Sequence, residues 1–369
     1  MSDLVRDAAF MRRALRIATR GWGQTAPNPM VGAVVVVGDD VVGEGHHARY
    51  GGAHAEVAAL RAAGERARGA TVYVTLEPCA HYGKTPPCVD ALIAAGVARV
   101  VIAVRDPSRI ARGGAERLRA AGIHVDEGVE RDAALELNAA FFNAHAGDRP
   151  WITLKLALSA DGAVADPTGA RRWITGPESR AEVHRIRANN DAILIGIGTA
   201  LADDPELTVR DAPQPRVPPT RVVLDRQLRL PMGSRLVRSA RVTATIVFTD
   251  STRVASVEAD ALRNAGVQVE SVGGGLHDVF GALRAREIRS VLVESGPRLT
   301  AALLGESLVD RLVIFQSSLV LGQRAPRAFE LAPPGFESSL MARRVVDQRR
   351  FGPDLMTAYA FRDVPCSPD

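Results

Sequence analysis

The sequence predicts an α/β protein built from two domains, and three observations support this prediction. The chain has 369 residues, a length that suits two domains with separate cores. Helical and strand-like patterns alternate through both halves, which is typical of sheets covered by helices. The alternation restarts after the segment Ala146–Pro150, which contains glycine and proline. We therefore expect one domain at residues 1–147 and a second at residues 148–369.

The first half begins with a helix and continues with strands and helices in turn. Apolar residues at helical spacing predict a helix over residues 6–20, ended by Gly21. Continuous apolar or β-branched runs predict buried strands. Gly64 ends the helix predicted over residues 53–63, and Gly96 ends the helix predicted over residues 89–95. After the first helix the expected order is strand 30–37, strand 41–45, helix 53–63, strand 71–76, helix 89–95, strand 100–104 and helix 114–121.

The second half shows the same kind of alternation. The proline-rich stretch Asp211–Pro219 is expected to be a surface loop. No internal repeat or low-complexity tract is evident. The expected elements are strand 151–158, helix 178–188, strands 192–197, 221–224, 244–248 and 290–294, and helix 298–304.

The composition excludes several classes of protein. No run approaches the roughly 18 apolar residues that span a bilayer, and the start lacks the order of a secretory signal, so we expect a cytoplasmic enzyme without membrane partners. Three cysteines argue against a disulfide framework, and Cys366 near the end is expected to be incidental. The net charge of +4 is spread along the chain, which favours a small anionic substrate over nucleic acid.

Two short segments together contain the side chains of a catalytic zinc site. They supply His54, Cys79 and Cys88 as ligands, and a catalytic zinc typically keeps three protein ligands and one open position. His54 and Cys88 each precede a predicted helix, where the helix dipole favours anions. Glu56 is then free to transfer protons. His-x-Glu followed by Pro-Cys and a second Cys is the signature of zinc-dependent base deaminases, so the segments predict hydrolytic removal of an amino group.

Other interpretations of these residues stay open. His81 lies between the two cysteines and is a rival ligand or a substrate contact, ranked below His54 because His54 is paired with Glu56. Glu56 alone fits a solvated helix charge. At the level of the whole protein, the alternatives are an RNA-editing deaminase with a nucleic-acid-binding domain and a structural protein held together by metal. The absence of a dense Lys/Arg stripe argues against the first of these.

The spacing of the cysteines distinguishes one group of deaminases from others. Deaminases of nucleosides and nucleic acids usually have a gap of about two residues between the cysteines, whereas residues 80–87 make this gap eight residues long. The stretch Thr75–Cys88 resembles the pyrimidine deaminase of bacterial riboflavin biosynthesis, and Pro27–Gly32 resembles the substrate-facing loop of that family. The resemblance implies that Asn28 hydrogen-bonds the pyrimidine; an ordinary turn is the alternative.

The resemblance continues through the second half, to the bifunctional deaminase/reductase of the same pathway. It is carried by Thr153–Gly162, Trp173–Gly176, Gly196–Arg210 and Val293–Pro297. It implies a cytidine-deaminase-like three-layer domain followed by a dihydrofolate-reductase-like α/β domain. It also implies one Zn²⁺ per chain, NADPH, a small phosphorylated pyrimidine substrate and a homodimer or homotetramer. The implied reactions are deamination of 2,5-diamino-6-(5-phosphoribosylamino)pyrimidin-4-one and reduction of its ribosyl chain to ribityl.

The same resemblance assigns residues to the reductase half. Independently of it, Ser295–Pro297 joins a strand to a helix, a junction whose backbone N–H groups can face a pyrophosphate. The residues implied for NADPH are Ala157, Trp173, Thr199, Asp203, Gly296, Pro297, Arg298, Leu299, Thr300, Ala301 and Ala302. Those implied for the substrate are Lys155, Arg171, Arg187, Leu207, Arg210 and Glu294. The alternatives are an exposed helix charge for Arg187 and a core position for Leu207.

Lys155 and two departures from the family pattern qualify this assignment. Lys155 and Lys84 are the only lysines in the chain, and Lys155 lies in an apolar strand, where an unpaired ammonium is costly. We therefore expect it at a strand edge, pointing into a cleft. Arg171 occupies a position where the family often has serine, and the loop Asp106–Gly114 is one residue short and lacks an asparagine. A deaminase with a non-reducing substrate-binding or regulatory second domain is therefore the alternative.

Overall fold

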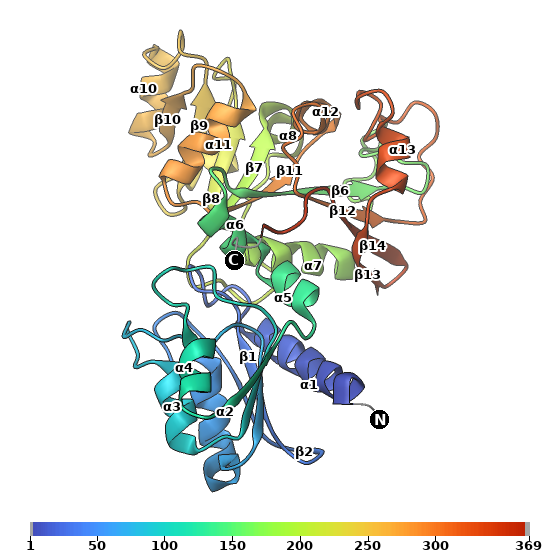
Figure 1. The fold of residues 1–369 in the computed structure, drawn as a ribbon. Coiled ribbons are helices and arrows are strands. Elements are labelled where there is room, and N and C mark those ends of the chain that lie inside the picture. The colour runs from blue at the N-terminus through green and yellow to red at the C-terminus, as the bar shows by residue number, and fades with distance from the viewer. Residues whose placement is uncertain (1–2, 366–369) are drawn as a thin grey trace. The chain divides into compact units, whose positions relative to one another are not determined.

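The computed structural model describes residues 3–365 and divides into two compact α/β units (Figure 1). The first unit contains residues 3–147 together with residues 364 and 365, and the second contains Asp148–Asp363. Cys366 lies outside the described residues. Each unit has its own sheet and its own buried apolar core.

The first unit is built on a five-stranded sheet in the order β2-β1-β3-β4-β5. Strand β1 is antiparallel to β2 and β3, whereas β3, β4 and β5 are parallel. The elements are α1 (Asp3–Ala18), η1 (Thr19–Gly21), β1 (Gly32–Val37), β2 (Asp40–His46), α2 (Ala55–Ala63), η2 (Gly64–Ala67), β3 (Thr71–Val74), α3 (Cys88–Ala95), β4 (Arg99–Ile102), α4 (Gly114–Ala120), β5 (His124–Glu127), α5 (Arg131–Leu137) and α6 (Ala139–Ala146).

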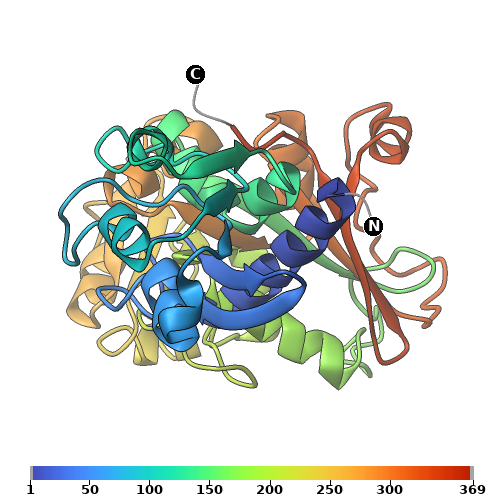
Figure 2. The ribbon, with the colours of Figure 1, turned by 60° about the horizontal axis from the view of Figure 1, so that its bottom comes forward.

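Helices cover both faces of this sheet, giving three layers. Figure 2 shows the dark-blue helix α1 and the lighter-blue helix α2 on opposite sides of β1 and β2. On the α2 side, alternate strand residues such as Val35 and Val72 pack with Leu92 of α3 and Leu118 of α4. On the α1 side, Tyr73 stacks against Phe10 at 5.2 Å between ring centroids. Because successive side chains of a strand point to opposite faces, each strand contributes residues to the apolar layers on both sides of the sheet.

Two glycines of β2 determine how closely α2 approaches the sheet. A Cβ added to Gly43 would lie 2.3 Å from the Ala59 carbonyl oxygen, and one added to Gly45 would lie 2.3 Å from the Ala55 carbonyl oxygen. Because backbone cannot yield as a flexible side chain can, any larger residue would displace the helix. The pair thus fixes the position of the N-terminus of α2, which follows directly after His54.

The second unit is built on a nine-stranded sheet in the order β10-β9-β8-β7-β11-β6-β12-β14-β13. The first seven strands in this order are parallel, and the β13–β14 hairpin is added in antiparallel fashion. The elements are β6 (Trp151–Leu158), α7 (Pro177–Ala188), β7 (Ala192–Gly196), α8 (Ile197–Asp203), β8 (Thr220–Leu224), α9 (Arg235–Arg238), β9 (Thr245–Thr249), α10 (Val257–Asn264), β10 (Gln268–Ser271), α11 (Leu276–Ala285), β11 (Ser290–Glu294), α12 (Pro297–Gly305), β12 (Arg311–Gln316), α13 (Phe336–Met341), β13 (Val345–Phe351) and β14 (Asp354–Ala360).

Strand β6 shows how this sheet separates core from site. Its even-numbered residues, such as Leu154 and Leu156, pack in the main apolar cluster with α11 and α12. Its odd-numbered residues Lys155 and Ala157 face the other side and are only partly buried. Ligands of open parallel sheets bind at the carboxyl ends of the strands, so the loops after β6, β7 and β11 are the positions that matter for function.

The α/β class and the predicted elements are confirmed to within a few residues. The sequence reasoning omitted several elements, including β5, the helices α5, α6, α10, α11 and α13, and the strands β10, β12, β13 and β14. Among residues 3–365, no helix is long and apolar enough to cross a bilayer.

Candidate active sites

The first unit brings His54, Cys79 and Cys88 together in a cluster of potential metal ligands. One donor atom from each side chain lies within 4.8 Å of the other two. His54 Nδ1 is 3.2 Å from Cys88 Sγ and 3.6 Å from Cys79 Sγ. His54 Nε2 is directed elsewhere, 3.4 Å from the Thr85 hydroxyl. Nδ1 is therefore the histidine nitrogen that can ligate a metal, and Thr85 can orient the ring from behind.

These distances fit a zinc ion. Zn–N bonds of about 2.0 Å and Zn–S bonds of about 2.3 Å in a tetrahedral site place nitrogen and sulfur about 3.5 Å apart. The two observed N···S distances are close to this value. Two sulfurs with one imidazole nitrogen also form a donor set that zinc favours. The three residues present therefore fit zinc with one position left for a reactant.

Local structure explains why the three ligands meet. His54 is the residue before α2, and Cys88 is the first residue of α3. Cys79 lies in the loop after β3, where its Sγ accepts a hydrogen bond from the Cys88 amide at 3.3 Å. His81 is not a member of this cluster. Two helix N-termini and one strand end thus converge, and this convergence favours anionic ligands.

The electrostatics of the cluster suit proton transfer and metal binding. Glu56 is 2% exposed, and its Oε2 has no hydrogen-bond partner among the described residues. Burial raises the pKa of the Glu56 carboxyl above its ordinary value. A hydrogen bond from the Cys88 thiol, with a smaller contribution from His54, lowers the pKa of Cys79. The same hydrogen bond, together with burial, raises the pKa of Cys88. Cys79 is thus the first of the two thiols to ionise.

Asn28 lies beside this cluster and is oriented by a histidine that the sequence reasoning missed. His47 is 3% exposed, and its Nδ1 is 3.1 Å from the Ala53 carbonyl oxygen, which only accepts. Its Nδ1 must therefore donate, leaving Nε2 to accept from Asn28 Nδ2 at 3.3 Å. The Asn28 carbonyl oxygen is consequently turned away from His47. The consecutive histidines 46 and 47 at the end of β2 were the available signal.

Glu77 holds the shortened loop 106–114 next to the cluster. Its carboxylate accepts hydrogen bonds from the amides of Asp106, Gly113 and Ala115 at 3.0–3.1 Å. The carboxyl of Asp106 is itself buried, and burial raises its pKa to about 7. The departure from the family pattern therefore lies on a loop that is tied firmly to the motif containing Cys79.

The second unit brings Lys155, Arg187 and Glu294 together although they come from three separate elements. Lys155 of β6 and Glu294 of β11 are register partners on adjacent strands, with Lys155 Nζ 3.2 Å from Glu294 Oε2. Arg187 of α7 donates to both oxygens of Glu294, at 2.6 and 3.1 Å. Burial by itself would raise the pKa of Glu294, but Arg187 and Lys155 outweigh it and hold that pKa below its ordinary range.

This cluster corrects two expectations. Strand β6 lies inside the sheet between β11 and β12, so the expectation that Lys155 occupies a strand edge is wrong. The desolvation of Lys155, 14% exposed, is offset by Glu294 rather than by solvent. The alternative that Arg187 is an exposed helix charge is also wrong, because its side chain is 11% exposed and paired.

Most of the residues expected to contact NADPH follow the carboxyl ends of β7 and β11. Helix α12 starts after Gly296, and Ser295 and Thr300 bridge its first turn through their hydroxyls at 2.9 Å. A Cβ added to Gly196, at the end of β7, would lie 3.7 Å from Leu299 Cδ2. Desolvation raises the pKa of Asp203, and Arg172 and Lys155 oppose that rise. Asp203, in the helix that follows β7, is therefore close enough to Lys155 and Glu294 to be influenced by their charges.

The other expected reductase residues lie in loops around this region or in the sheet. Trp173 is 53% exposed, with the guanidinium carbons of Arg172 and Arg180 at 5.2 and 5.1 Å from its ring. Arg171 is exposed, and its amide donates to Asp166 at 3.0 Å. Ala157 is half-buried on β6 and pairs with Phe315 on β12.

Leu207 and Arg210 lie in one segment, residues 204–210, but their side chains differ in exposure. Leu207 is 3% exposed and packs in an apolar cluster with α9 and α10, which agrees with its alternative assignment as a core residue. Arg210 has a side chain that is 46% exposed and donates to Glu206 and Thr208, both at 2.9 Å. The arginine, not the leucine, is therefore presented to solvent.

Both units match families of known proteins. Residues 4–104 match the cytidine and deoxycytidylate deaminase zinc-binding region, and residues 150–356 match the RibD C-terminal domain. The riboflavin biosynthesis protein RibD of Aquifex aeolicus is 42% identical over 340 residues, covering 92% of this chain and 94% of the relative. That of Escherichia coli is 41% identical over 365 residues, covering 95% and 98%.

Solved structures agree with these matches over the whole chain. Acinetobacter baumannii RibD is 37% identical with a TM-score of 0.80, covering 97% of this chain and 99% of the other. A Thermotoga maritima protein described as a diaminohydroxyphosphoribosylaminopyrimidine deaminase/5-amino-6-(5-phosphoribosylamino)uracil reductase is 33% identical with the same TM-score and coverage. The predicted fold class, a deaminase-like domain followed by a reductase domain, is confirmed. The chain belongs to the RibD family of riboflavin-biosynthesis proteins.

Proposed function

We propose that this enzyme carries out two consecutive steps of riboflavin biosynthesis, one in each unit. Residues 1–147 would remove the 2-amino group of 2,5-diamino-6-(5-phosphoribosylamino)pyrimidin-4-one. Residues 148–369 would then reduce the ribosyl chain of 5-amino-6-(5-phosphoribosylamino)uracil with NADPH. The names of the RibD relatives and of the Thermotoga maritima protein support this assignment. The observation that carries it is the buried Glu56 carboxylate, without a partner at Oε2, beside His54, Cys79 and Cys88.

In the first unit each residue has a distinct role. His54 Nδ1 and the thiolates of Cys79 and Cys88 would hold one Zn²⁺, which when bound activates water for attack on the ring carbon. Glu56 takes up a proton from the water and delivers protons to the ring nitrogen and the departing ammonia. Its raised pKa suits both directions of transfer. Asn28, oriented by His47, accepts a hydrogen bond from the pyrimidine.

In the second unit the residues position two reactants. NADPH supplies the hydride, and residues 296–302 at the start of α12, with Ala157, Trp173, Thr199 and Asp203, would bind it. Lys155 contacts the sugar that is reduced, while Glu294 holds the Lys155 ammonium in position through a hydrogen bond. Because Arg187 is committed to Glu294, the more exposed Arg210 is the better partner for the ribose phosphate. Arg171, which is exposed, completes the substrate set, whereas the buried Leu207 would support the segment that carries Arg210.

A coupled assay of the full chain tests both halves. With the diamino substrate and NADPH we expect ammonia release followed by NADPH oxidation. With the deaminated uracil alone we expect NADPH oxidation without ammonia release. Ammonia release without NADPH oxidation on either substrate would favour the alternative in which the second domain is a non-reducing substrate-binding or regulatory module.

Assembly and location are proposed from the family and the sequence. We expect a homodimer or homotetramer, which light scattering of the purified protein would test. We expect the enzyme in the cytoplasm, which fractionation of cells would test. Neither expectation alters the roles of the residues above.

A further inference from the structure

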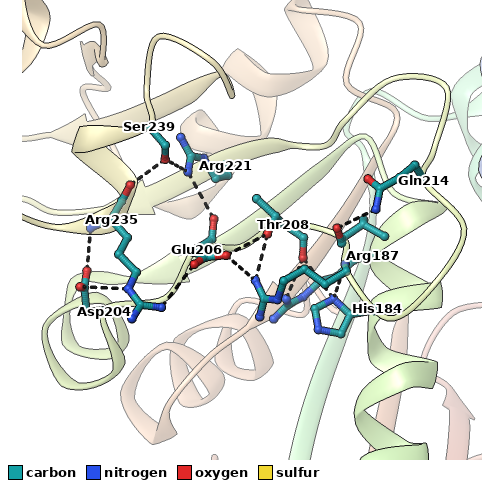
Figure 3. A network of polar contacts seen from close by, with 11 residues as sticks. His184, Arg187, Asp204, Glu206, Thr208, Gln214, Arg221, Arg235 and Ser239 are labelled. Carbon is teal, nitrogen blue, oxygen red and sulfur yellow. Dashed lines mark hydrogen bonds and ion pairs between the residues drawn. The ribbon is translucent and has the colours of Figure 1, made fainter.

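The segment 204–210 of the second unit is held by polar side chains from several elements. Asp204 and Leu207 have φ angles of 37° and 51°, in the left-handed region that non-glycine residues rarely adopt. Arg235 binds Asp204 and Glu206, and the buried Arg221 donates to the Glu206 carbonyl oxygen at 3.3 Å (Figure 3). A strained conformation of this kind persists only where the surroundings impose it.

Helix α7 holds the other end of the segment, through two residues one turn apart. Arg187 donates to the Thr208 carbonyl oxygen at 3.2 Å while it also binds Glu294. His184, 6% exposed, directs Nδ1 at the same stretch of backbone (Figure 3). This nitrogen is 3.1 Å from the Thr208 carbonyl oxygen and 3.2 Å from the Arg210 amide nitrogen.

The two contacts of His184 Nδ1 exclude each other. A single ring nitrogen either donates to Thr208 or accepts from Arg210, depending on the tautomer. The Thr208 carbonyl oxygen already has Arg187 as a donor. Within residues 3–365, the only acceptor that the structure gives to the Arg210 amide is His184 Nδ1. The tautomer with its proton on Nε2 therefore satisfies both backbone groups.

The charges around His184 favour this neutral form. Arg187 on its own helix and Arg210 on the neighbouring segment oppose a positive charge, while Asp211 and Glu294 favour one. Burial is the largest influence, and together with the arginines it lowers the pKa of His184. Protonation would place a hydrogen on Nδ1 and turn the acceptor for Arg210 into a donor.

We propose that neutral His184 is a positioning residue of the reductase site, holding the Arg210 amide so that the segment 204–210 presents Arg210 to the phosphate of the substrate. This proposal rests on the function proposed above. It predicts that loss of the Nδ1 acceptor weakens binding of the phosphorylated substrate more than it slows reduction. It also predicts that acid weakens the same binding.

The test uses the full chain with three variants. His184→Leu removes the acceptor, and His184→Asn keeps an oxygen near the position of Nδ1. His277→Leu is the matched control, because His277 is on α11 of the same unit with a side chain 67% exposed and 4.0 Å from Glu306. KM and kcat are measured for 5-amino-6-(5-phosphoribosylamino)uracil and for NADPH.

We expect His184→Leu to raise the KM for the uracil substrate about tenfold, the effect of losing one hydrogen bond to a binding segment, with kcat within about twofold. The KM of His184→Asn for the uracil substrate should stay within about threefold of the parent value, and the KM of His277→Leu should equal the parent value. The proposal is overturned if His184→Leu keeps the parent KM. It is equally overturned if both His184→Leu and His184→Asn lower kcat and raise the KM for both substrates to a similar extent, because that pattern indicates only a structural role.

A pH series separates His184 from the phosphate, which titrates in the same range. The ratio of parent to His184→Asn KM should rise as pH falls from about 7.5 to about 5, since only the parent gains a charge at this position. A constant ratio would contradict the proposal. If the parent enzyme oxidises no NADPH with the uracil substrate, the proposed function itself fails, and that result is distinct from a failure of the variants.

Discussion

The two units each bury a glutamate at their candidate site, and the two glutamates are held in opposite ways. Glu56 is 2% exposed, with a carboxylate oxygen that has no hydrogen-bond partner among the described residues. Glu294 is 12% exposed, with Lys155 and Arg187 bound to it. Burial raises the pKa of the first, whereas the two cations lower that of the second despite burial.

This difference teaches what each site still requires. The first site has potential metal ligands and a glutamate whose Oε2 has no hydrogen-bond partner among the described residues, an arrangement that suits a bound metal ion. In the second site the glutamate is paired with two cations of the chain itself, Lys155 and Arg187, and it holds the lysine in place. The first site offers ligands for a group from outside the chain, whereas the second brings together charges from distant parts of the chain itself.

The largest expected effect breaks the first site alone. Cys88→Ser should lose bound zinc, measured as about one ion per chain in the parent, together with essentially all ammonia release. NADPH oxidation with the deaminated uracil should be unchanged, because no ligand of the cluster belongs to the second unit. Cys366→Ser is the control and should keep its zinc. Zinc retained by Cys88→Ser would contradict the ligand assignment.

The next effect tests the proton carrier without touching the ligands. Glu56→Gln should keep zinc but slow ammonia release by about 10²–10⁴-fold, the range for loss of a general acid–base. Glu65→Gln, at an exposed position just after α2, is the matched control. Unaltered ammonia release in Glu56→Gln would remove Glu56 from the mechanism.

A third effect tests the ion pairs of Glu294 in the second site. Glu294→Gln leaves Lys155 and Arg187 without their anion, and should lower the stability of the second unit by about 3 kcal/mol. Urea unfolding followed in that unit measures this loss, with the exposed Glu337→Gln as control. A loss under about 0.5 kcal/mol would mean that the cluster contributes no more than a surface ion pair.

The smallest effect is the pH dependence of the same pair. Because the pKa of Glu294 is lowered in the folded state, its stabilisation is present above the unfolded pKa of about 4.3 and is lost as pH falls below it. The stability gap between the parent and Glu294→Gln should therefore shrink by about 1 kcal/mol per pH unit below about pH 4. A gap that is constant with pH would show that ionisation of Glu294 does not matter for folding.

The first site was accessible from sequence because its chemistry is local. His54 and Glu56 are two residues apart, Cys88 directly precedes a predicted helix, and Cys79 follows a predicted strand by three residues. The spacing of Cys79 and Cys88 then indicated the substrate family. His47 was missed because its role depends on a tautomer set by the Ala53 carbonyl oxygen, and no residue pattern encodes that contact.

The second site was only partly accessible because it depends on strand order. Lys155 and Glu294 are 139 residues apart, and only the placement of β6 next to β11 makes them neighbours. The prediction of an edge position for Lys155 failed for this reason. The hairpin of β13 and β14 was missed because β13 is a mostly exposed edge strand without clear alternation. His184 gave no signal beyond its place on a predicted helix.

The position of β6 also has a consequence for how the protein is made. This strand is the first of its unit to be synthesised, yet its two neighbours in the sheet, β11 and β12, are made only after β7, β8, β9 and β10. At synthesis rates of about 5–20 residues per second, Lys155 waits roughly 7–28 seconds for Glu294 to be added. During that interval the nascent chain already contains every residue of the first sheet. The sheet of the deaminase half can therefore form on the ribosome while the sheet of the reductase half is still incomplete and its apolar strands are exposed to aggregation.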